Sequence, residues 1–190
     1  MLSRKIVFTI VLAAALFAFP IGRSQGADET KTNDHEAAKA ATPTRSARQV
    51  VTSTSFSPAV SEFLQKPFAS QLVTLNPSGS PQVTVMWFKY DNGALLFTTT
   101  TDRNKFRNMQ KDSRAVFSVV DPTNMYKWVI VHGKLSVVDG RDPKAFYSGL
   151  AEHYLNAESL AEWRKTAGMD RRTVLRLTPT QISTMGFPQQ

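Results

Sequence analysis

The sequence contains no cysteine among its 190 residues. The protein therefore has no disulfide bond, no thiolate nucleophile and no thiolate-held zinc or iron–sulfur centre. Hydrophobic residues make up 42% of the chain and aromatic residues 10%, a composition typical of a globular protein with a single core. We therefore expect one domain with an additional tail.

Histidine is also scarce, and the common catalytic motifs are absent. The chain has only His35, His132 and His153, and none of them begins an H-E-x-x-H motif. It has no glycine-rich dinucleotide motif, no phosphate-binding loop and no serine nucleophile elbow. We interpret His132 and His153 as structural, expect no metal, and assign no catalytic residue from the sequence.

The charge of the chain is basic but not strongly so, with a formal net charge of +8. Nucleic-acid binding would require this charge to gather on one face beside stacking aromatic rings. Trp87, Phe88, Tyr126 and Trp128 instead occupy predicted strands, where aromatic residues typically belong to a core or a dimer interface. We expect no nucleic-acid partner.

No apolar run reaches the roughly 20 residues that a membrane-spanning helix requires. The longest begins at Ile6, directly after Arg4 and Lys5, and ends before Pro20. This pattern predicts a secretory signal peptide over residues 1–26. The protein would then be exported to the periplasm or secreted, and tethered to the membrane only if the signal stays uncleaved.

The remainder divides into a polar segment and a patterned body. Residues 27–54 are rich in Ala, Thr, Ser, Lys and Glu and predict a disordered linker. The folded domain is expected over residues 55–190. Within it, a Ser57 cap followed by Pro58 predicts a helix at 57–64, and apolar periodicity predicts one at 142–154. Another turn or two of helix is expected at 159–165.

The rest of the body has the alternation and turn residues of short strands. Gly133 predicts a bend in one of them. The strands are expected at 70–75, 82–90, 94–99, 114–120, 126–138 and 172–177, the last continuing at 181–185 past Pro179. Six antiparallel strands with few helices favour a mainly β fold that closes into a small barrel, because closure removes exposed sheet edges.

The most informative segment runs from Thr98 to Met109. Its hydroxyl-bearing strand end leads into a helix start, where free backbone N–H groups and the helix dipole attract an anion. Arg103, Arg107 and Lys111 recur every four residues along one stripe of that helix. The segment predicts a phosphate-binding site, and the alternative is a solvated basic helix face.

Three linked segments carry a resemblance to a known family: Leu72 to Phe88, Leu95 to Asn108, and Ala115 to Pro122. Their order and spacing resemble the FMN-binding split-barrel superfamily of pyridoxamine 5'-phosphate oxidase-like proteins. The chain is most similar to the branch that uses the deazaflavin coenzyme F420, over residues 57–187. The resemblance implies a six-stranded antiparallel split β-barrel with short flanking helices, which forms a homodimer with active sites between subunits.

The resemblance also implies where a cofactor would bind. The flavin-like ring would lie against the second strand, at Gln82, Val83, Thr84, Val85, Met86 and Trp87. The phosphate and the anionic tail would be held after the third strand, by Thr98, Thr99, Thr100, Arg103, Lys105, Arg107 and Asn108.

The implied function is that of an exported oxidoreductase in which reduced F420 passes a hydride to an unsaturated small molecule. One alternative keeps the fold and binds FMN. The other is a non-catalytic binding module for a flavin, haem or lipid-like ligand.

Overall fold

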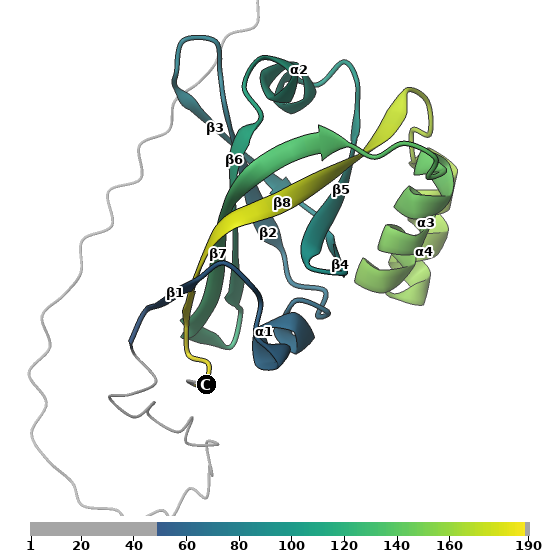
Figure 1. Cartoon of the computed structure of the whole chain (residues 1–190). Helices are drawn as coiled ribbons and strands as arrows, with labels where there is room; N and C mark the ends of the chain where they lie inside the picture. Colours follow the sequence, from purple (N-terminus) through teal and green to yellow (C-terminus); the bar gives the residue numbers. More distant parts are fainter. Residues whose placement is uncertain (1–48, 189–190) are drawn as a thin grey trace, which may run out of the picture. The chain divides into compact units, whose positions relative to one another are not determined.

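The computed structural model describes residues 49–188, which form eight strands and four helices (Figure 1). The signal peptide expected over residues 1–26 lies outside the described residues, as does most of the expected linker. The strands are β1 (Val51–Ser53), β2 (Ser70–Leu75), β3 (Pro81–Met86), β4 (Lys89–Asp91), β5 (Ala94–Thr100), β6 (Arg114–Asp121), β7 (Asn124–Val137) and β8 (Arg172–Met185). The helices are α1 (Pro58–Phe63), α2 (Asn104–Lys111), α3 (Pro143–Tyr154) and α4 (Ala157–Thr166).

All strand pairs are antiparallel, and the sheet has the order β3-β2-β6-β7-β8-β5-β4, with β1 added beside β8. The two ends of this order, β3 and β4, are consecutive in the sequence. Only Trp87 and Phe88 separate them. The chain therefore crosses from one edge of the curled sheet to the other at this point, and the fold is a mainly β split barrel with short helices.

Local chemistry explains most of the element boundaries. Ser57, Asp142 and Asn156 cap α1, α3 and α4, each accepting a hydrogen bond from a backbone N–H of the first turn. The β4–β5 hairpin turns at Asn92 and Gly93, which have φ values of 47° and 76°. Asn and Gly are the residues that tolerate positive φ, so this turn was predictable.

The predicted bend at Gly133 is confirmed. The pairing of β7 with β8 shifts register between His132 and Gly133, opposite Pro179. A Cβ at Gly133 would lie 2.3 Å from the carbonyl oxygen of Thr178, so only glycine permits this approach of the two strands. β8 continues past Pro179 to Met185, as expected.

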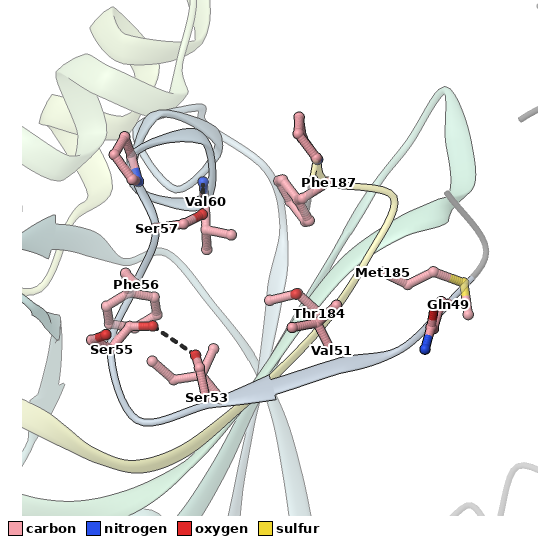
Figure 2. A pocket seen from close by; sticks show the side chains of 13 residues that line it. Gln49, Val51, Ser53, Ser55, Phe56, Ser57, Val60, Thr184, Met185 and Phe187 are labelled. Carbon is pink, nitrogen blue, oxygen red and sulfur yellow. Dashed lines mark hydrogen bonds between the residues drawn. The ribbon is translucent and has the colours of Figure 1, made fainter. Parts of the chain in front are cut away.

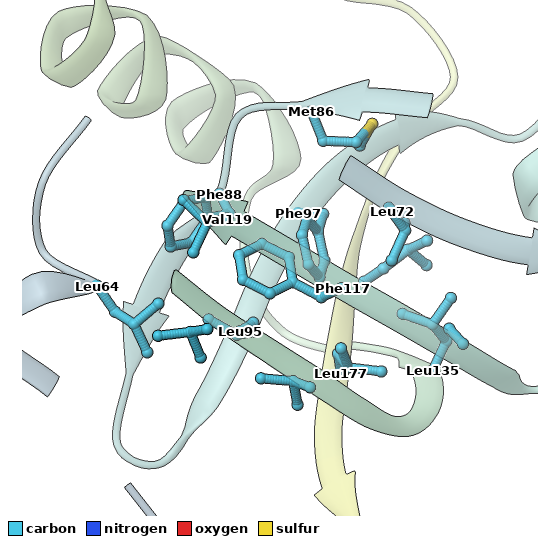
Figure 3. Close-up of a cluster of buried hydrophobic side chains, with 14 of the residues drawn as sticks. Leu64, Leu72, Met86, Phe88, Leu95, Phe97, Phe117, Val119, Leu135 and Leu177 are labelled. Carbon is cyan, nitrogen blue, oxygen red and sulfur yellow. The ribbon is translucent and has the colours of Figure 1, made fainter. Parts of the chain in front are cut away.

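The barrel interior holds the main core, which is built largely from aromatic and branched side chains (Figure 3). The Phe117 ring lies at its centre, 4.9 Å from the Phe88 ring and 5.9 Å from the Phe97 ring between centroids. Leu64 of the α1 end and Leu72, Leu95 and Leu177 of the strands complete the packing.

A second apolar layer lies outside the barrel, where α3 covers β5 and β8 (Figure 1). Residues of β5 alternate, so Leu95 and Phe97 enter the core while Ala94, Leu96 and Thr98 face outward. Leu150 and Ala151 of α3 are buried on this side. The outward face of β5 is therefore buried as well, and it leads toward Thr98.

The strand count differs from the six that were expected. The predicted strand 82–90 is divided into β3 and β4, because Trp87 and Phe88 leave the ladder to span the split. The sequence predicted one continuous strand, because large apolar side chains alternate without interruption across residues 82–90. The other addition is β1, whose residues Val51–Ser53 fall inside the segment expected to be linker and pair with Thr184 to Ile182.

The two ends of the described segment enclose a cavity of about 270 Å³ between β1, the start of α1 and the end of β8 (Figure 2). Phe56, Val60, Thr184 and Phe187 are among its lining residues, and Ser53 Oγ donates to the Ser55 carbonyl oxygen at 2.7 Å. No helix within residues 49–188 is long and apolar enough to span a membrane.

Candidate functional site

A pocket of about 250 Å³ opens where the barrel is split, outside the β3–β4 crossing. It is lined by residues from four elements and from the crossing: Val85 and Met86 of β3, Trp87 of the crossing, Thr98 of β5, Tyr147 of α3 and Arg172 of β8. The pocket thus combines apolar, aromatic, hydroxyl and cationic groups. Such a combination suits a planar ligand that carries an anionic group.

The Thr98 hydroxyl is the most informative polar group in this pocket. Thr98 is only 8% exposed, and its Oγ1 has no hydrogen-bond partner within the described residues. The preceding residues on the outward face of β5, Ala94 and Leu96, are apolar, so the hydroxyl stands where the hydrophobic part of that face ends. Leaving a buried hydroxyl unpaired costs free energy, and a ligand acceptor would remove that cost.

Arg172 is held beside Thr98 by the register of the sheet. It lies opposite Thr100 where β8 begins, and Thr98 is two residues further on the same face. Its Nε donates to the Gly168 carbonyl oxygen at 2.7 Å, and its guanidinium carbon lies 3.3 Å from the Tyr147 ring centroid. Burial lowers the pKa of Arg172, and it has no carboxylate partner in the described region. Its charge is therefore available to an anion.

Two further cations extend this positive region at the start of α2. Arg103 is the N-cap residue of α2 and provides no side-chain capping bond, so the first backbone N–H groups of the helix lack that partner. The pKa of Lys105 is lowered, mainly by burial and to a smaller extent by the positive charge of Arg103. The positive charge of Arg103 also contributes to the lowered pKa of Arg172. Arg103, Lys105 and Arg172 hence form one basic cluster, in which no member has an ion pair among residues 49–188.

Aromatic rings form the other wall of the pocket. The Trp87 ring stacks on Tyr154 with a centroid distance of 5.4 Å and an interplanar angle of 20°. Tyr147 contacts Trp163 of α4 edge to face at 4.9 Å and accepts a hydrogen bond from Trp163 Nε1 at 3.2 Å. These contacts hold Trp87 and Tyr147 in place and therefore fix the width of the pocket.

The Tyr154 hydroxyl also forms hydrogen bonds with the backbone at the β3–β4 crossing. It accepts a hydrogen bond from the Phe88 backbone N–H at 3.3 Å and lies 3.2 Å from the Phe68 carbonyl oxygen and 3.3 Å from that of Phe88. Burial raises the pKa of Tyr154 to about 12, although the backbone bond at Phe88 opposes this shift. Tyr154 is therefore neutral at physiological pH and acts as a structural bridge at the crossing.

The remaining predicted site residues are distributed among different surroundings. Val83 faces away from the barrel on β3, whereas Thr84 and Gln82 share the inward parity of Met86. Thr99 is buried on the core side of β5, opposite Thr98. Alternation along each strand therefore separates residues that the resemblance grouped at the ring on β3 and at the phosphate on β5.

Asn108 is a structural connector. It is 3% exposed, and its Nδ2 lies within hydrogen-bond distance of Thr74 Oγ1, Asn76 Oδ1 and Gln82 Oε1, at 3.2, 3.0 and 2.9 Å. An amide has two donor hydrogens, so these three acceptors already saturate it. Asn108 and Gln82 thus join α2 to the β2–β3 hairpin.

Arg107 is exposed and donates to Asn104 one turn earlier on α2. With Lys111 and the β2–β3 turn it lines a second hollow, of about 540 Å³. No residue of α2 lines the pocket at the split, so this hollow is separate from that pocket. The two cations of the hollow continue the stripe that begins with Arg103 at the N-cap of α2.

The sequence interpretation missed Arg172 and Tyr147. Arg172 is the first residue of a predicted strand, but its proximity to Thr98 depends on the β5–β8 pairing across more than 70 residues. Tyr147 lies on a predicted helix, yet only the packing of α3 against β5 directs its ring to the pocket. No local sequence pattern indicates that either residue lies at the pocket. No cluster of three potential metal ligands occurs in residues 49–188.

Comparison with known proteins identifies the class to which this fold and pocket belong. The chain has the split-barrel fold of flavin-binding oxidoreductases. Residues 56–186 match the family model described as pyridoxamine 5'-phosphate oxidase, and the chain belongs to that family. No curated protein matches the sequence.

Solved structures agree with this assignment. One, named F420 reductase, is 34% identical, with a TM-score of 0.55, and the match covers 64% of this chain and 93% of that chain. A conserved hypothetical protein from Mycobacterium tuberculosis is 22% identical, with a TM-score of 0.54 and coverages of 71% and 91%. The haem storage protein HutZ from Vibrio cholerae is 20% identical, with a TM-score of 0.51 and coverages of 68% and 94%. The last two support the fold alone.

Proposed function

We propose that this protein is an exported, homodimeric oxidoreductase that uses coenzyme F420 to transfer a hydride to an unsaturated small molecule. The observation that carries the proposal is the pocket at the split, where an unpartnered buried hydroxyl adjoins a basic cluster and an aromatic wall. The 34% identity with a protein named F420 reductase supports the choice of cofactor.

The residues of the pocket fit an anionic, planar cofactor. Thr98 Oγ1 lacks a partner, and Arg103, Lys105 and Arg172 form no ion pair among the described residues. These four groups would hold the phosphate. Charge-assisted hydrogen bonds of this kind are the stronger ones in proteins.

The cofactor supplies the hydride chemistry, while the protein supplies binding, orientation and exclusion of water. Val85, Met86 and Trp87 would bound the ring on its apolar side, and the Trp87–Tyr154 stack keeps that wall from moving. Tyr154 is hydrogen-bonded to the backbone and has a pKa of about 12, so it is no general base near neutral pH. The protein would thus contribute by positioning the cofactor and the substrate, and Tyr154 would not take part as a base.

The second hollow favours F420 over FMN. One phosphate needs only the cluster at the split, whereas F420 carries an additional polyanionic tail. Arg107 and Lys111, further along α2 on the stripe that begins at Arg103, would bind that tail. FMN binding would leave both of these cations without a role.

Homodimer formation is supported by the outer face of the sheet. Val83 and Val85 on β3 are 61% and 69% exposed. Val83, Val73 and Val116 are in register on three adjacent strands, so they form an apolar row. A second copy would cover this row and bring another chain to the edge of the pocket. Export is proposed from the signal-like residues 1–26.

A titration of the mature protein with both cofactors tests the cofactor proposal. Lys105→Ala should weaken F420 and FMN alike by about tenfold or more, because it removes a charge-assisted bond to the shared phosphate. Arg107→Ala should weaken F420 alone, and F420 binding should fall more steeply with salt.

Equal effects of Arg107→Ala on both cofactors, or preference for FMN at every salt concentration, would contradict the assignment to F420. The absorbance spectrum of the purified protein separates the remaining alternatives. A bound flavin spectrum supports FMN, and a Soret band supports a haem-binding module.

A further inference from the structure

A separate cavity of about 340 Å³ lies on the other side of the β3–β4 crossing from the pocket described above. It is enclosed by the end of α1, by β4 and by α3, and it shares no lining residue with the pocket at the split. Phe88 forms part of its wall, whereas Trp87, the preceding residue, lines the other pocket. The two sites are thus separated by the chain that crosses the split.

Helix α3 serves both sites with different stripes of its surface. Phe146, Gly149, Leu150 and His153 follow the i, i+3, i+4, i+7 spacing of one helical face, and all of them line the cavity. Tyr147 and Tyr154 belong to the neighbouring stripe and contact Trp87.

Gly149 is the unusual member of this face. It stands inside α3, where glycine is less favourable than alanine by about 1 kcal/mol. A Cβ at this position would meet no atom within 4 Å, so no protein contact requires glycine here, and its φ is not positive. Gly149 is itself a lining residue and is exposed, so the missing side chain leaves open space at the surface of the cavity.

The walls and the rim of the cavity have different character. Leu64, Phe88, Phe146 and Leu150 provide apolar walls, and Lys89 and His153 provide polar groups. No carboxylate lines the cavity, and Lys89 forms no ion pair in the described part of the chain. The nearest acid on β4, Asp91, is paired with Arg141 at 3.0 Å. The cavity therefore has an apolar interior with uncompensated positive charge.

We infer that this cavity is a binding site for a small amphipathic carboxylic acid. The apolar body would lie over Gly149 between Phe88 and Phe146, and the carboxylate would meet Lys89 and the imidazole of His153. Pockets for drug-sized ligands begin at about 300 Å³, so the volume suits a short-chain or single-ring acid. The site does not depend on which cofactor occupies the pocket at the split.

Calorimetric titration of the full-length protein with octanoate, and with 1-octanol as the uncharged analogue, tests this inference without any cofactor. Octanoate should bind saturably, at least about tenfold more tightly than 1-octanol, because only the acid gains charge-assisted hydrogen bonds. Lys89→Gln should remove most of this difference, whereas Lys144→Gln, on the same helix as His153 but outside the cavity, should not.

Gly149→Leu should fill the cavity and abolish octanoate binding. Gly149→Ala should weaken binding while raising the melting temperature, since it introduces a better helix former into open space. Gly168→Leu is the matched control, because Gly168 also has open space around it and lies outside the cavity. It should leave octanoate affinity unchanged.

Three results would overturn the inference: no octanoate binding at millimolar concentration, equal affinity for octanoate and 1-octanol, or wild-type octanoate affinity in Gly149→Leu. If Gly149→Leu fails to fold, the two single variants Gly149→Ala and Lys89→Gln replace it. Wild-type octanoate affinity in both of them would overturn the inference equally. Loss of F420 binding in any of these variants would not bear on this site.

Discussion

Replacement of Thr98 by valine should stabilise the protein without cofactor and weaken its cofactor binding. Valine has nearly the shape of threonine but lacks the hydroxyl, and Thr98 Oγ1 is buried with no partner in the described structure. An unsatisfied buried polar group costs about 1–3 kcal/mol. Thr98→Val should therefore raise the free energy of unfolding by about 1 kcal/mol, taking the lower end because the residue is 8% exposed.

Binding should change in the opposite direction. A hydrogen bond to a charged phosphate contributes about 1.5–3 kcal/mol, which corresponds to about 10–100-fold in affinity. Urea unfolding of the cofactor-free protein measures the first effect, and cofactor titration measures the second. A purely structural threonine would not move the two quantities in opposite directions.

Thr99→Val is the matched control, because Thr99 is the same residue type one position along β5 on the core side. Its Oγ1 lies 3.5 Å from the Thr100 carbonyl oxygen, the outer limit of a hydrogen bond. This variant should leave cofactor affinity unchanged. Unchanged affinity in Thr98→Val, or a loss of stability in that variant, would refute the assignment of Thr98 to the cofactor site.

Three further variants test the structural roles assigned above. Tyr154→Phe should lower the free energy of unfolding by about 1–3 kcal/mol, because the Phe88 N–H loses its partner. In the wild type, folded Tyr154 has a pKa of about 12 while the unfolded residue titrates near 10, so the stability should be complete below pH 10 and decline between pH 10 and 12. Unfolding curves of Tyr154→Phe should lack this decline. Asn108→Ala should also cost about 1–3 kcal/mol by urea unfolding, because Thr74 is left buried without its amide partner. Val83→Lys should convert the proposed dimer to monomers in sedimentation, and a wild type that is monomeric at micromolar concentration would contradict the proposed dimer.

The sequence was most informative where structure depends on neighbouring residues. The Ser57 cap and an Asn-Gly turn predicted α1 and the β4–β5 hairpin closely, because these signals act within four residues. The position of α3 was also predicted, whereas α4 begins two residues before the expected segment, after the cap Asn156 that the prediction did not use. Gly133 and Pro179 similarly identified the bend of the long strands. The family resemblance then provided the barrel topology, which local patterns alone left open.

The candidate site was less predictable, because it depends on contacts between distant segments. Asn108 is a polar residue on a basic helix, and its sequence position does not reveal the three acceptors that surround it. Thr98 and Thr99 are identical in type and adjacent, and only the covering of β5 by α3 distinguishes the unpartnered hydroxyl from the one on the core side. Arg172 reaches the site through strand pairing alone.

The location of both proposed sites follows from the way in which the barrel closes. A closed ladder would leave no room for a ligand, whereas the crossing at Trp87 and Phe88 interrupts the backbone hydrogen bonds for two residues. The Tyr154 hydroxyl compensates for that interruption from α3. Because Trp87 faces one pocket and Phe88 the other, the residues that bridge the sheet edges also form a wall of each site. A substitution that relaxes this crossing should therefore change ligand affinity at both sites, while substitutions at Thr98 or Gly149 should change only one.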